Sequence, residues 1–181
     1  MNKSSWICLI ALTCCARSAL PAEYYVDPKL GSAENDGSNE KPWKSLQDVV
    51  DRGLISSQQW SSLPFRAGNR LVPKNPRAPI KAGDTILLRS GFHGQLSIQD
   101  HYNIGPITIA AQEGHVPRFS RIRIRSSAFW TLRGLHVSPQ FADTYETGTL
   151  IDLDAHGFRG PVRNIVIEAC RLMSVEDSSE W

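Results

Sequence analysis

Short alternations of apolar and polar residues dominate the chain between positions 85 and 172, and they predict β-strands. In the run SRIRIRS (120–126), the two isoleucines would face one side of a sheet and the three arginines the other. Further runs of this kind are TILLRS, QLSIQ, ITIAAQ, WTLRGLHV, TLIDLDA and NIVIEACRL. No second helical pattern interrupts the series, which excludes a fold of alternating strands and helices.

One short amphipathic helix is predicted ahead of the strand series. Ser45 and Asp48 have the spacing of a weak capping box, and Leu46, Val49 and Val50 then fall on one face at helical spacing. Such a helix needs an apolar surface to cover. Residues 56–82 contain four prolines and no sustained period, so they are expected to form a long irregular excursion.

An internal repeat relates residues 129–138 to residues 164–173. The alignment places Trp130 on Ile165 and Leu132 on Ile167 as inward positions, and Gly134 on Ala169 at a bend. It also places Arg133 on Glu168, Leu135 on Cys170, His136 on Arg171 and Val137 on Leu172. Repeats of this kind predict stacked strand units, each of which buries its apolar face against its neighbours.

The first residues have the pattern of a secretory signal, because Lys3 precedes the short apolar run WICLIALTCC and small residues follow it. We expect removal of residues 1–22 and a secreted or periplasmic mature domain of residues 23–181; a lipid anchor at Cys14 or Cys15 would need a better lipobox. No later run predicts a membrane span. Three of the four cysteines leave with the signal, and Cys170 is expected to be a buried core thiol.

The runs YYVDPKLGSAENDGSNEKPWKSLQDVV, KAGDTILLRSGFHG, PITIAAQEG and AFWTLRGLHVS resemble the N-terminal layout of right-handed parallel β-helix proteins of the pectate-lyase-like superfamily. The resemblance implies an all-β fold with a short N-terminal capping α-helix, in a secreted, carbohydrate-active protein. We also expect the protein to be a monomer. Members are usually longer, so the resemblance also implies that this chain is the N-terminal part of a larger protein or is truncated at its C-terminus.

The segment between Asp27 and Gln47 is rich in acidic and turn-forming residues, as calcium loops are, but its spacing does not fit an EF-hand. We interpret it as a turn-rich connector between the first strand and the helix, with an incidental ion at Asp27 or Asp36 as the alternative. The formal net charge of +2 gives no basis for nucleic-acid binding.

The strongest candidate for a metal site is the run IDLDAH. On a strand, Asp152, Asp154 and His156 share one face, with successive side chains about 6.6 Å apart. Oxygen ligands at this spacing suit Ca²⁺, which could offset the carboxylate of an acidic sugar. The alternative is a solvated polar face that runs into a turn.

The arginine row of Arg121, Arg123 and Arg125 is the candidate substrate-binding site, because arginine binds carboxylates through paired hydrogen bonds. The alternative is an ordinary charged face that protects a strand from aggregation. Arg133 and Glu168 are expected to pair with each other if they occupy stacked units.

The remaining side chains favour structural roles. Trp43 is expected to anchor the capping helix, and His93, His101 and His115 to be exposed or capping residues. The functional expectation is a polysaccharide lyase-like protein for acidic glycans, or a glycoside hydrolase, with no catalytic residue identified. The alternatives are a non-catalytic glycan-binding or cell-surface β-helix module and an inactive fragment.

Overall fold

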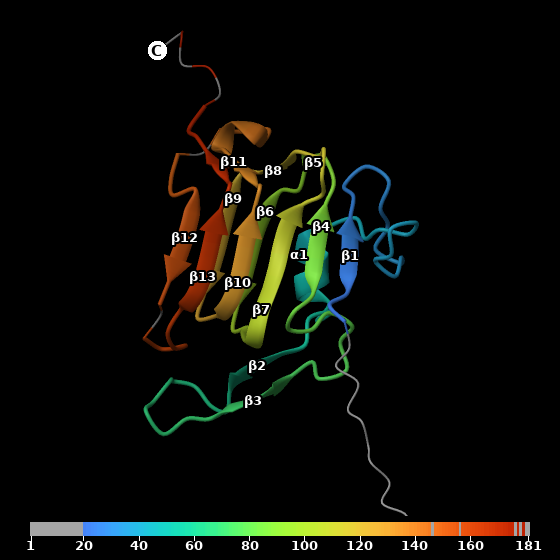
Figure 1. The fold of residues 1–181 in the computed structure, drawn as a ribbon. Coiled ribbons are helices and arrows are strands. Elements are labelled where there is room, and N and C mark those ends of the chain that lie inside the picture. Colours follow the sequence, from blue (N-terminus) through green and yellow to red (C-terminus); the bar gives the residue numbers. More distant parts are fainter. Residues whose placement is uncertain (1–19, 146, 156, 176, 178, 180–181) are drawn as a thin grey trace, which may run out of the picture.

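The computed structural model describes residues 20–145, 147–155, 157–175, 177 and 179 of the chain. Its strands form three sheets in which most neighbouring strands are parallel (Figure 1). The seven-stranded sheet contains β1 (Glu23–Val26), β2 (Ser57–Trp60), β3 (Leu71–Lys74), β4 (Thr85–Leu88), β7 (Tyr102–Ala111), β10 (Ala128–Arg133) and β13 (Arg163–Glu168). The four-stranded sheet contains β5 (Gly91–Phe92), β8 (Pro117–Phe119), β11 (His136–Val137) and β14 (Arg171–Leu172). The three-stranded sheet contains β6 (Gln95–Gln99), β9 (Arg121–Arg125) and β12 (Ile151–Asp154).

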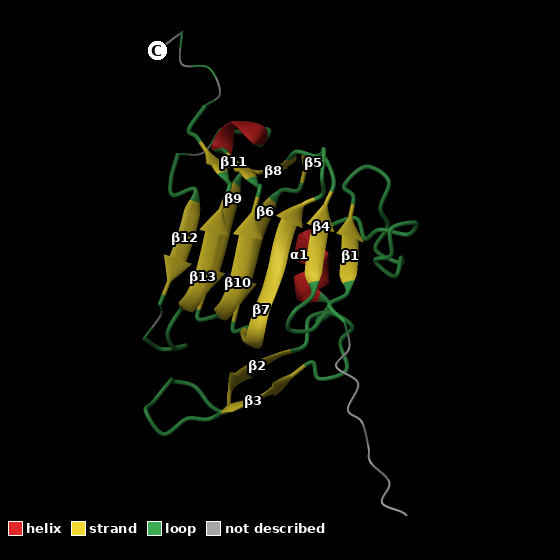
Figure 2. Cartoon of the chain, viewed as in Figure 1, coloured by secondary structure: helices red, strands yellow, loops and turns green. Residues whose placement is uncertain are grey.

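From β4 onward the chain passes through these sheets in a fixed order. Each circuit places one strand in the seven-stranded sheet, the next in the four-stranded sheet and the third in the three-stranded sheet. Equivalent strands of neighbouring circuits pair with each other in parallel. The predicted all-β fold of stacked strand units is therefore confirmed, with α1 (Leu46–Asp51) and a short 3₁₀ turn (Pro139–Phe141) as the helical elements that the structure describes (Figure 2).

The excursion between residues 56 and 82 is not irregular throughout, and this prediction was wrong. Strands β2 and β3 form an antiparallel hairpin in which Gln58 pairs with both Pro73 and Tyr102, so the seven-stranded sheet is mixed. The hairpin escaped the pattern analysis because its strands are only partly buried and carry no apolar alternation. Pro73 is compatible with a strand at the periphery of a sheet.

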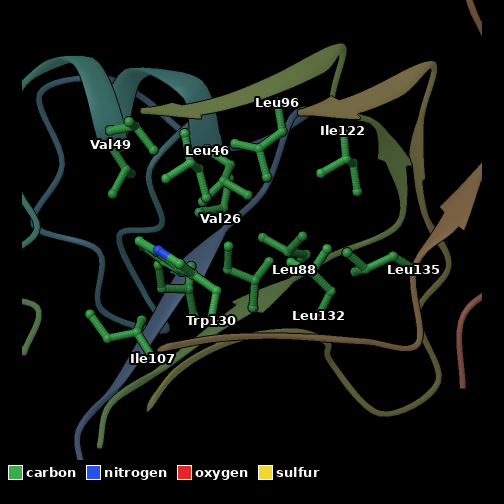
Figure 3. Close-up of a cluster of buried hydrophobic side chains, with 14 of the residues drawn as sticks. Val26, Leu46, Val49, Leu88, Leu96, Ile107, Ile122, Trp130, Leu132 and Leu135 are labelled. Carbon is green, nitrogen blue, oxygen red and sulfur yellow. The ribbon is translucent and has the colours of Figure 1, made fainter. Parts of the chain in front are cut away.

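The core lies between the sheets, where equivalent apolar residues of successive circuits are stacked in register (Figure 3). Ile86 is opposite Ile109, and Ile109 is opposite Leu132; all three have no exposed surface. The three-stranded sheet contributes Leu96 and Ile122 in the same way. Burial of such a side chain stabilises the fold by about 1.5–3 kcal/mol.

Helix α1 covers the core beside β1 and β6, as predicted. Ser45 Oγ accepts the N–H of Asp48 at 3.3 Å, which caps the helix, and Leu46 and Val49 point into the core (Figure 3). Trp43 is only 3% exposed and stacks on Tyr24, which confirms its expected role as an anchor.

The internal repeat is confirmed by the strand register. Trp130 pairs with Ile165 and Leu132 with Ile167 across β10 and β13, at the positions that the alignment gives. Gly134 and Ala169 both have positive φ values, of 70° and 52°, where the chain bends between sheets. A conformation that glycine adopts freely is thus imposed on an alanine by its place in the stack.

The last circuit is less covered than the others. Leu153 is 42% exposed and Ile167 38% exposed, although both continue core positions. Cys170 follows the same trend. Full burial was expected, but the side chain is only partly buried and packs against the core from the outermost circuit. No further strand lies over these side chains in the part of the chain that the structure describes.

The acidic segment after β1 is a turn-rich connector. Asp27 Oδ1 accepts the N–H groups of Lys29 and Leu30 at 2.8 and 3.0 Å, and its Oδ2 lies 3.4 Å from Arg89 Nη1. Burial alone would raise the pKa of Asp27, but these donors outweigh it and hold the pKa below its ordinary value. Both oxygens of Asp27 therefore serve the turn and the ion pair.

Candidate polysaccharide-binding face

The outward side of the three-stranded sheet carries the predicted arginine row. In β9, Ile122 and Ile124 have no exposed surface, whereas Arg121, Arg123 and Arg125 are half-buried on the opposite side. Strand β6 adds a polar residue beside each arginine, because Gln95, Ser97 and Gln99 are their register partners. The face is therefore a regular grid of polar side chains, with strands about 4.8 Å apart.

Strand β12 places the predicted aspartates against the same row. Arg123 is opposite Asp152, with Nε 3.2 Å from Oδ2, and Arg125 is opposite Asp154, with Nε 3.4 Å from Oδ2. These side chains are about one third exposed. The residues predicted to bind substrate and those predicted to bind metal are thus brought together as ion pairs; their ligand roles remain predictions.

The third predicted metal ligand, His156, lies outside the described residues. Within the described ranges, no group of three or more histidine, cysteine, aspartate or glutamate residues is arranged to hold a metal ion. A cation at Asp152 and Asp154 would have to compete with two guanidinium groups.

Arg121 differs from its neighbours in the row. Its Nε donates to the carbonyl of Thr149 at 3.1 Å, and none of the described carboxylates forms an ion pair with it. It lines two small cavities, one of about 180 Å³ with Gln95 and Ser120 and one of about 140 Å³ with Arg123 and Asp152.

A larger groove lies at the other side of the face, between α1, β3 and β6. It has a volume of about 510 Å³, and its wall includes Ser97, Gln99, Lys74 and His101. Gln47 of α1 binds β6 through both ends of its amide, since Oε1 accepts the N–H of Ser97 at 2.7 Å and Nε2 donates to its carbonyl at 3.2 Å. The helix thereby fixes one edge of the groove.

Lys74 was missed by the sequence analysis. Its Nζ donates to the carbonyls of Gln99 and Asp100 at 3.3 and 3.0 Å. Burial lowers the pKa of Lys74, and Arg159 adds to this effect, although the carboxylate of Asp100 opposes it. The sequence shows only a lysine at the end of the run LVPK. Its position beside His101 and the groove becomes apparent only when β3 pairs with β2 in the hairpin.

His101 lies next to Lys74 and is buried, so the expectation of an exposed or capping residue was wrong. Its Nδ1 is 3.0 Å from Ser57 Oγ, and its exposed fraction is 3%. Burial, with a smaller contribution from the charge of Lys74, lowers the pKa of His101 to about 3. The imidazole is therefore neutral at physiological pH.

The other predicted side chains lie away from this face. His93 is also buried, against the expectation, and stacks on Phe119, while His115 Nδ1 accepts the N–H of Ser90 at 3.0 Å. Arg133 and Glu168 form the predicted cross-strand pair, with Nε 2.5 Å from Oε1.

Comparison with known proteins adds no assignment. No model of a known protein family matches the chain, and a search of curated proteins finds no significant match. Within the described residues, the helices are too short or too polar to cross a membrane.

Proposed function

We propose that the chain is a right-handed parallel β-helix protein of the pectate-lyase-like kind. The fixed order in which the chain visits three parallel sheets supports this architecture. Its handedness follows from the general rule that connections between parallel strands of one sheet are almost always right-handed. The signal pattern in residues 1–22 supports export to the periplasm or the cell exterior.

The function that the geometry supports best is the binding of an acidic polysaccharide along the outward face of the three-stranded sheet. The observation that carries it is the regular polar grid of Gln95, Ser97 and Gln99 beside the arginine row, with cavities at both of its sides. Polysaccharide hydroxyl groups need donors and acceptors at repeated spacings, and such a grid supplies them. The arginine row adds a preference for carboxylates.

Elimination of the bound uronate is the second candidate function, and Lys74 favours it. A lyase needs a base that removes the proton next to the uronate carboxylate, and a cation or arginine that neutralises this carboxylate. Lys74 lines the groove beside the face, and burial lowers its pKa, which increases the fraction of neutral amine. Gln99, whose carbonyl accepts from Lys74, is the register partner of Arg125.

The test is affinity electrophoresis of the exported protein in gels that contain polygalacturonate, fully methyl-esterified pectin or a neutral galactan. We expect retardation by polygalacturonate and weaker retardation by the two uncharged polymers. Equal mobility in all gels would contradict the proposed binding. In parallel, ultraviolet absorbance of an unsaturated product that disappears in Lys74→Gln would establish elimination, and binding without such a product would leave a glycan-binding module.

A further inference from the structure

We propose that Arg121 is the carboxylate-recognition residue of this face, and that it takes the carboxylate of one uronate residue of the polysaccharide. This inference rests on the proposed function and deepens it, since it divides the arginine row into one ligand-binding residue and two residues held by ion pairs.

The division follows from the sequence of β12 and the residue before it. Asp154 and Asp152 stand opposite Arg125 and Arg123. The position that precedes β12 and follows next in the register, opposite Arg121, is Leu150; it is not acidic, and its side chain packs partly against the core while its carbonyl accepts the N–H of Ile122 at 2.9 Å. The acidic series therefore ends one position early, and the charge of Arg121 is left without a carboxylate among the described residues.

The local backbone holds this guanidinium in place without neutralising it. The carbonyl of Thr149 takes only the Nε donor of Arg121, at 3.1 Å. Gly148 has a φ of 152°, and a Cβ at this position would collide with Nη2 of Arg121. The segment thus approaches the arginine closely because residue 148 has no side chain, and the terminal nitrogens keep their donors for a ligand.

The two cavities beside Arg121 have the size and polarity for a sugar carboxylate. A single water molecule needs a volume of roughly 10–15 Å³, and each of these two cavities is about ten times as large. Gln95, the register partner of Arg121, offers an amide to a neighbouring hydroxyl group. Asp152 repels an anion from the side of Arg123, which leaves Arg121 as the point where a carboxylate can form paired hydrogen bonds.

The experiment compares Arg121→Gln, Arg121→Lys and the control Arg70→Gln in polygalacturonate gels and in methyl-esterified pectin gels. Arg70 is exposed between β2 and β3, outside the three-stranded sheet, and its substitution removes the same single charge. We expect Arg121→Gln to weaken polygalacturonate affinity by about threefold to tenfold, with Arg121→Lys between it and the wild type. Arg70→Gln should keep the wild-type affinity, and methyl-esterified pectin should not distinguish the variants.

If the wild type is retarded but Arg121→Gln and Arg70→Gln behave alike, the assignment of Arg121 is overturned while the binding face stands. If sulfated dextran retards the wild type as strongly as polygalacturonate does, with the same dependence on Arg121, the site recognises anions in general and the carboxylate assignment is overturned. If no acidic polymer retards the wild type, the proposed function itself fails. Urea unfolding midpoints and far-ultraviolet circular dichroism of each variant identify a loss of folding, and Arg121→Lys, which keeps the charge and most of the length of the side chain, then provides the second test of the same site.

Discussion

Arg123 Nε lies 3.2 Å from Asp152 Oδ2, so each of these residues is the nearest ionic partner of the other. They belong to neighbouring strands and are paired in register. An arginine that could bind an acidic sugar and an aspartate that could bind a cation are therefore both occupied, and the pair Arg125 and Asp154 repeats the arrangement.

Calcium binding should consequently depend on removal of the arginines. In Arg123→Gln/Arg125→Gln, two aspartates about 6.6 Å apart on one strand face would lose their partners. We expect the Ca²⁺ affinity measured by isothermal titration calorimetry to rise by about tenfold or more over the wild type, because a divalent cation then replaces two monovalent ones. Equal affinities in the wild type and the variant would show that the aspartates do not form a latent calcium site.

The ion pair itself should contribute little to stability. Its side chains are about one third exposed, and pairs of this kind contribute about 0.2–1 kcal/mol. A double-mutant cycle with Arg123→Gln, Asp152→Asn and the combined variant, followed by urea unfolding, should give a coupling energy in this range. Coupling that is absent at low salt would mean that the two groups do not interact in solution.

The stacked core should respond much more strongly. Trp130 has no exposed surface and packs between the circuits, so Trp130→Ala should lower the free energy of unfolding by about 3–5 kcal/mol. Ile104 on the neighbouring strand β7 is 77% exposed, so Ile104→Ala should change the free energy of unfolding by less than about 0.5 kcal/mol. Similar losses in both variants would contradict the assignment of the core.

The free energy of unfolding should fall as the pH falls below the pKa that His101 has in the unfolded state. Burial lowers the pKa of His101 to about 3 in the folded state, whereas the unfolded residue titrates near 6.5. The unfolded state thus binds more protons between these values, so the contribution of His101 to stability is present above about pH 6.5 and is lost progressively as the pH falls toward 3. His101 alone should account for a loss of about 2 kcal/mol between pH 8 and pH 5.

Urea unfolding of the wild type and His101→Asn at both pH values checks this expectation. The loss on acidification should be smaller in the variant, and what remains includes His93, whose pKa burial also lowers. A loss of the same size in both proteins would show that His101 is not held neutral by the fold.

Much of the fold could be predicted because its information is local or repeated. Ser45, Leu46 and Val49 define the capping helix within one turn, and the match of Trp130 to Ile165 sets the register of β10 and β13. Inward apolar positions specify register strongly, since a shift by one residue would turn them all outward.

The candidate site could be predicted only in part, because its contacts join segments with no shared pattern. The arginine row and the aspartates were visible, but their pairing depends on the register of β12 against β9, which no sequence pattern between these two strands indicates. Lys74 and His101 meet through the β2–β3 hairpin, whose polar strands carry no periodic signal.

The most direct test of the account is a map of backbone amide chemical shifts during titration of the isotope-labelled protein with oligogalacturonate. We expect saturable shifts at Ser97, Arg121 and Arg123 on the three-stranded sheet, and none at His136 and Val137 on the four-stranded sheet. Saturable shifts confined to another surface, or no shifts at any concentration, would contradict the proposal that this face binds acidic polysaccharide.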